Sequence, residues 1–147
     1  MKQGATRRRR GRGWAGLALG LLLGGLCLVA PRAWAGSYLD RSALLLEEAR
    51  REGDVCQARL GDREFLGMLL ALAEARAKAA QKMEVPAATA RAHPHLLLAL
   101  VDYASAYEAA LGGNFKRFVE QVTAARAEEK NFRARLKELG HPLEDLR

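Results

Sequence analysis

The sequence predicts an all-α protein: a small up-down bundle of three to four helices that follows an N-terminal signal peptide. Three observations carry this prediction. Alanine, leucine, arginine and glutamate, which are strong helix formers, dominate the chain. The chain contains no isoleucine, and no segment alternates convincingly between apolar and polar residues, so no sheet is predicted. Apolar residues instead recur every three or four positions along several segments, as one face of a helix requires.

The first 35 residues have the layout of a secretory signal peptide. They begin with a basic stretch that ends at Arg12, and an uncharged run follows from Trp14 to Ala30. The triplet that ends at Ala35 has the small-x-small pattern cleaved by signal peptidase. We expect cleavage after Ala35, with an uncleaved membrane anchor as the alternative, because the uncharged run reaches the lower length limit for spanning a bilayer. Either way the remainder is translocated, so the predicted location is the bacterial periplasm or the medium outside the cell.

The charge of the chain is concentrated in this leader. The chain has 24 Lys and Arg residues against 17 Asp and Glu. Seven of the bases and none of the acids lie in residues 1–35, which leaves 17 of each in the remainder. A pI near 9.9 is typical of proteins that bind nucleic acids or anionic membranes. Because that basicity belongs to the leader, no nucleic-acid partner is predicted, and a membrane is expected only if the leader is kept.

Residues 36–140 are predicted to form one helical domain, followed by a C-terminal tail over residues 141–147. The first helix is expected over residues 38–52, with an apolar face of Leu39, Ala43, Leu46 and Ala49. Two glycines bracket residues 53–61. A break in the helix is predicted there, because each glycine costs about 1 kcal/mol in a helix interior; one long continuous helix is the alternative.

The second helix is predicted to begin after Asp62, its N-cap, and to run to about Met83. Two apolar faces lie side by side on it. The face expected to meet the core consists of Phe65, Met68, Leu69, Leu72, Ala79 and Met83. The second face consists of Leu66, Leu70, Ala73, Ala77 and Ala80. A helix that is apolar over so much of its girth should lie centrally or contact a partner.

A connection bounded by two prolines leads to the third helix, predicted from Pro94 or His95 to Leu111. Two glycines end it, and Asn114 is placed to cap the next helix. So short a turn predicts that the third and fourth helices form an antiparallel hairpin.

The fourth helix, over residues 115–139, carries the clearest pattern. Its apolar positions repeat every three and four residues as a heptad seam: Phe115, Phe118, Val122, Ala125, Glu129, Phe132, Leu136 and Leu139. The seam is either internal to the bundle or a surface for a partner helix, supplied by another protein or by a second copy. On the second interpretation the partner-binding residues are Phe118, Val122, Phe132, Leu136 and Leu139. Glu129 must then pair with an arginine or lie where the seam meets solvent, because an unpaired buried carboxylate is costly.

Candidate metal ligands are His93, His95 and His141, joined in space by acids such as Asp102 or Glu84. Imidazole suits zinc, copper or nickel, although the spacing of these histidines matches no standard structural zinc site. No cofactor is predicted, because the chain has neither a Cys-x-x-Cys-His run for haem nor a Glu-x-x-His pair for a di-iron site.

Catalysis is not predicted either. The sequence has no Gly-x-Ser-x-Gly turn and no Walker motif. Cys56 is the one cysteine after the leader; it is predicted to be buried, with a reactive thiol or an intermolecular bridge as alternatives. Tyr103 and Tyr107 share a helix face, where they either pack in the core or frame an apolar ligand pocket.

These observations predict an exported, non-catalytic helical interaction or accessory protein of the bacterial envelope. It is expected to dock a partner through an apolar helix face, either the seam of residues 118–139 or the alanine-rich face of the second helix. The alternative is a periplasmic bundle that binds a ligand or a metal, as a sensor of stress or metal would.

Overall fold

The computed structural model describes residues 30–143. The chain divides into two compact units between Ala33 and Trp34. Within the described residues the protein is all-helical, with four helices and no strands: α2 (Ala30–Ala58), α3 (Arg63–Gln81), α4 (His93–Leu111) and α5 (Phe115–Glu138). The predicted leader lies outside the described residues, except that α2 begins at Ala30, before the predicted cleavage point. Of the predicted tail, residues 144–147 also lie outside them.

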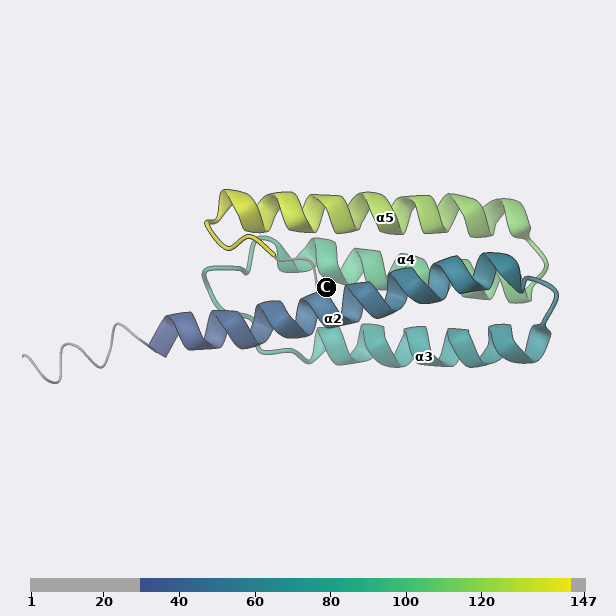
Figure 1. Ribbon diagram of the computed structural model, residues 1–147, viewed down its shortest axis with the longest axis horizontal. Coiled ribbons are helices and arrows are strands. Elements are labelled where there is room, and N and C mark those ends of the chain that lie inside the picture. Colours follow the sequence, from purple (N-terminus) through teal and green to yellow (C-terminus); the bar gives the residue numbers. More distant parts are fainter. Residues whose placement is uncertain (1–29, 144–147) are drawn as a thin grey trace, which may run out of the picture. The chain divides into compact units, whose positions relative to one another are not determined.

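Successive helices run in opposite directions, and α4 packs along both α3 and α5 (Figure 1). The termini of the last three helices agree with the sequence-based prediction to within about two residues. The Asp62 side chain accepts a hydrogen bond from the Phe65 amide at 3.0 Å and caps α3. Asn114 accepts one from the Arg117 amide at the same distance and caps α5. After α4 and after α5 the chain turns through Gly113 and Gly140, which have φ near +76° and +78°, a conformation that favours glycine.

The predicted break after residue 52 is wrong, because α2 continues through Gly53 to Ala58. The reason is tertiary packing. Gly53 is buried, and a Cβ built on it would lie 3.2 Å from Cε1 of Tyr103 on α4. Cys56, one turn further along, is buried as well. Burial of this stretch against α4 outweighs the unfavourable helix propensity of glycine.

The assignment of the two apolar faces of α3 is also wrong. The residues buried on α3 are Leu66, Leu69, Ala73, Ala77 and Ala80, most of them from the face that was expected to be secondary. In contrast, Met68 is 54 % exposed and Leu72 is 47 % exposed. Two leucines and three alanines of α3 therefore pack in the core, and the alanines let α3 approach its neighbours closely, while Met68 and Leu72 remain at the surface.

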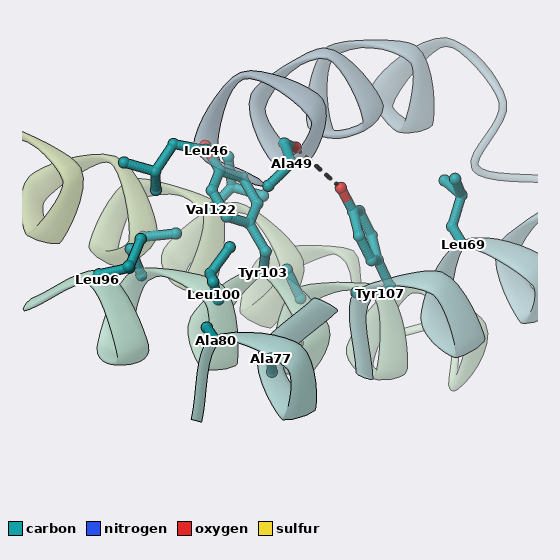
Figure 2. Packing of buried hydrophobic residues seen from close by; sticks show 14 of the residues in the cluster. Leu46, Ala49, Leu69, Ala77, Ala80, Leu96, Leu100, Tyr103, Tyr107 and Val122 are labelled. Carbon is teal, nitrogen blue, oxygen red and sulfur yellow. Dashed lines mark hydrogen bonds between the residues drawn. The ribbon is translucent and has the colours of Figure 1, made fainter. Parts of the chain in front are cut away.

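The core lies where α2, α3 and α5 face α4 (Figure 2). Tyr103 and Tyr107 are fully buried in it, which favours core packing over an apolar ligand pocket between them. The Tyr107 hydroxyl donates a hydrogen bond to the backbone carbonyl of Ala49 on α2 at 3.3 Å, drawn as the dashed line in Figure 2. Each of the four helices therefore contributes to one continuous core.

The buried seam of α5 gives a test of the fold. Phe132→Ala and Leu136→Ala are expected to lower the free energy of unfolding by about 3–5 and about 2–5 kcal/mol, because each leaves a cavity in the core. Met68→Ala, at an exposed position, is the matched control and should change it by less than about 1 kcal/mol. Urea unfolding followed by circular dichroism measures all three. Undiminished stability of Phe132→Ala would show that the seam does not hold the bundle together.

A pair of glycine substitutions tests the approach of α2 to α4. Gly67→Ala should stabilise the protein by about 0.5–1 kcal/mol, because Gly67 lies inside α3 and a Cβ there meets nothing within 4 Å. Gly53→Val should instead destabilise it by about 1–3 kcal/mol, since the added atoms press on the Tyr103 ring. Thermal unfolding separates the two effects, and a Gly53→Val protein as stable as the wild type would contradict this account of the contact.

Candidate functional site

The structure places the predicted partner-binding residues of α5 inside the bundle. Phe118, Phe132 and Leu136 have no exposed surface and Val122 is 3 % exposed, while Leu139 is half-buried at the end of the helix. The chain's own helices thus already cover this seam. Its charged member, Glu129, is buried and pairs with Arg133 one turn along α5, at 3.1 Å. An arginine partner was one of the two arrangements predicted for this carboxylate.

The three histidines proposed as metal ligands do not meet at one site. His93 Nδ1 and the Tyr38 hydroxyl are hydrogen-bonded at 3.0 Å, which links the start of α4 to α2. His95 Nδ1 lies 2.6 Å from a carboxylate oxygen of Glu128 on α5. His141 is half-buried beyond the end of α5. In the part of the chain that the structure describes, no group of three or more His, Cys, Asp or Glu side chains is arranged to hold a metal ion.

Two titratable groups near these contacts, His93 and Asp102, have shifted pKa values. Burial lowers the pKa of His93 below its usual value near 6.5. On α4, burial first and then the negative charge of Glu128 raise the pKa of Asp102. His95 also lines a small cleft of about 360 Å³ whose other walls come from α5: Asn131, Ala134, Arg135 and Glu138.

Cys56 is buried on α2, as predicted, and burial raises the pKa of its thiol to about 11. At neutral pH this thiol is protonated, and a protonated thiol is a poor nucleophile. These surroundings favour the structural interpretation of Cys56 over the reactive one.

A larger cleft lies between α2 and α5, with a volume of about 520 Å³. On the α2 side it is lined by Arg50, Arg51 and Asp54, and on the α5 side by Arg126, Glu129, Lys130 and Arg133. We call it the basic cleft. Ion pairs cross and border it: Arg126 bonds to Asp54 at 2.5 Å, while Arg50 and Arg51 share the carboxylate of Glu47. The Glu47–Arg51 pair is one that the spacing of these residues on a helix predicts.

The sequence analysis did not predict this cleft, although the residues that α5 contributes follow a pattern visible in the sequence. Arg126, Lys130 and Arg133 follow the helical spacing i, i+4, i+7 and therefore share one face of α5. The other half lies more than 70 residues away on α2, and only the packing of α2 against α5 joins the two.

The second unassigned surface is an apolar stripe on α3, made of Phe65, Met68, Leu72, Ala75 and Ala79. These residues follow steps of three and four, so they lie on one helix face. Phe65 is half-buried beneath the Arg59 guanidinium, whose carbon lies 4.1 Å from the ring centre, and the other four are exposed. We call this surface the α3 stripe.

None of the described helices combines the length and the apolar character that are needed to cross a membrane.

The burial of His93 gives a testable pH dependence of stability. The pKa of His93 is lower in the folded than in the unfolded protein, so the unfolded state binds the extra proton more readily. The stability contributed by neutral His93 is therefore complete above pH 6.5 and is lost as pH falls toward the folded-state pKa. Urea unfolding of the wild type and His93→Gln, at pH 7.5 and pH 5.5, should show a smaller pH dependence in the variant. Equal pH dependence in both proteins would contradict the assignment.

Comparisons with known protein families, with curated proteins and with solved structures find no match to this chain.

Proposed function

We propose that the protein is an exported, non-catalytic interaction or accessory protein of the bacterial envelope, and that it docks a partner helix on the α3 stripe. One observation carries this proposal: beside the face that α3 buries in the core, two further large apolar side chains, Met68 and Leu72, are about half exposed. A soluble helix normally turns such residues toward the core. An apolar face that the chain does not cover is typical of a surface that another molecule covers.

The dimensions of the α3 stripe suit a helix as its occupant. The stripe is one helix face wide and extends over about four turns, from Phe65 to Ala79. Its second half consists of alanines, which permit close approach of a second backbone. Apolar anchors followed by small residues at steps of three and four are the pattern by which one helix packs along another.

The seam of α5 is not part of this surface. Its side chains are buried within the bundle, so a partner would have to unfold the bundle to reach them. Export remains a proposal that rests on the pattern of residues 1–35, which lies outside the described part of the chain apart from the start of α2.

The α3 stripe is tested by paired truncations. Met68→Ala combined with Leu72→Ala should weaken association on the order of 100-fold, since each buried side chain contributes about 1.5–3 kcal/mol. The matched control is Leu98→Ala combined with Val101→Ala, two exposed apolar positions on α4. Both double variants should keep the helicity and melting temperature of the wild type, because none of the four side chains is buried.

The measurement is crosslinking in intact envelopes of the native host, with sedimentation of the purified protein to detect self-association. The proposal predicts that one defined crosslinked species disappears only in the α3 variant. It also predicts that the protein from the host has the intact mass of a chain that begins at Gly36. Equal crosslinking in both double variants would exclude the α3 stripe as the docking surface. The intact mass of a chain that begins at Met1 would exclude cleavage of the leader.

A ligand-binding bundle is the second candidate function, and the basic cleft is the observation that favours it.

A further inference from the structure

The basic cleft between α2 and α5 is a concentration of positive charge in a part of the chain that is otherwise balanced. Five basic and two acidic side chains line it, whereas residues 36–147 hold equal numbers of both. Arg126 and Arg133 are neutralised by Asp54 and Glu129. Arg50 and Arg51 share the single carboxylate of Glu47, and Lys130 has no ion-pair partner among the described residues. The cleft therefore keeps an excess of about two positive charges even when Glu47 is counted.

Two buried polar groups, one on a residue that lines the cleft and one near it, lack hydrogen-bond partners among the described residues. The Tyr103 hydroxyl and the Nε–H of Arg126 are both buried, and neither meets a hydrogen-bond partner among the described residues. Arg126 and the acids Glu129 and Asp54 all lie close enough to influence the pKa of Tyr103, which burial, the largest effect, raises. An unsatisfied buried polar group costs about 1–3 kcal/mol, so a ligand that supplied a partner would bind more tightly.

A rotation of the Arg126 side chain would satisfy both groups. The Arg126 guanidinium lies close enough to the Tyr103 hydroxyl to influence its pKa, and it binds Asp54, which lines the cleft. If the guanidinium turned from Asp54 into the cleft, its Nε–H would gain any acceptor held there, and the Tyr103 hydroxyl would become accessible to the same acceptor. The Tyr103 hydroxyl both donates and accepts, so the Nε–H of Arg126 can donate to its oxygen, and the donor that still lacks a partner is the phenolic O–H. Its missing partner is an acceptor, as the oxygen of an anion is.

We propose that the basic cleft binds a small anion that carries two or more phosphate groups. The positive charges of Arg50, Arg51 and Lys130 attract the anion. Arg126 releases the carboxylate of Asp54 and binds the anion instead. The chemistry favours phosphate because the planar guanidinium presents paired donors that match phosphate oxygens, while Lys130 adds a point charge. It favours more than one phosphate because the cleft has more than one charge in excess and, at about 520 Å³, has room for a small molecule. This inference is independent of docking on the α3 stripe.

Calorimetric titration with inorganic pyrophosphate tests the site, with the protein in the form that its host makes. We expect saturable one-to-one binding. Arg51→Gln combined with Lys130→Gln should weaken it at least about tenfold, since two charges that face the anion are lost. The matched control is Arg63→Gln combined with Lys78→Gln, which removes the same charge from exposed positions on α3 and should change the affinity by less than about twofold. No saturable heat up to millimolar pyrophosphate, or equal loss in both double variants, would overturn the proposal.

Two further measurements address the identity of the anion and the role of Arg126. Citrate, a multivalent carboxylate, should bind more weakly than pyrophosphate, and equal affinity would overturn the assignment to phosphate. Tyr103→Phe removes the unpartnered hydroxyl and keeps the ring, so it should leave the melting temperature unchanged or higher while it weakens pyrophosphate binding several-fold. Unchanged affinity in Tyr103→Phe would overturn the rotation of Arg126, because the hydroxyl would then take no part in binding.

Discussion

Three consecutive residues of α2 hold that helix against the rest of the bundle, and the remaining structure depends on their joint placement. Glu52 makes two hydrogen bonds to Arg76 of α3, at 2.6 and 2.9 Å. Gly53 lies against the Tyr103 ring of α4. Asp54 binds Arg126 of α5. Because neighbouring residues on a helix point about 100° apart, three in sequence can meet three different helices, and α2 closes the core by being fixed to all of them at one level.

This arrangement also explains why the basic cleft lies where it does. Of the ion pairs at the cleft, Asp54–Arg126 joins α2 to α5. The pairs of Glu47 and of Glu129 each lie within one helix beside that junction. Asp54 and Arg126 are each partly exposed, at 61 % and 42 % of their side chains, so their pair is weak compared with the largely buried Glu52–Arg76 pair. An incoming anion can therefore compete for Arg126 without releasing α2 from α3 or from α4. A stable scaffold and an exchangeable ion pair thus coexist within one turn of helix.

Most of the fold could be predicted from the sequence, because caps, glycine stops and heptad spacing are local signals; Asp62, Asn114 and Gly113 all act as their patterns indicate. The errors arose where tertiary contacts decide. Helix propensity predicts a break at Gly53, but only the distant Tyr103 ring shows why a glycine is needed inside a continuous helix. Periodicity identified two apolar faces on α3 but could not say which one packs, and it favoured the bulkier face. The basic cleft joins residues 50–54 to residues 126–133, and no local pattern relates segments so far apart.

The contacts of residues 52–54 make the length of α2 as important as its composition. Insertion or deletion of one residue between Ala49 and Glu52 would rotate the following turn by about 100° relative to the Ala49–Tyr107 hydrogen bond. Glu52, Gly53 and Asp54 would then each face a helix other than the one they contact now. No substitution at a single position could restore all three contacts. Substitutions on the exposed face of α2 should thus be far better tolerated than insertions or deletions. In this segment the number of residues is a stricter constraint than the identity of the exposed side chains.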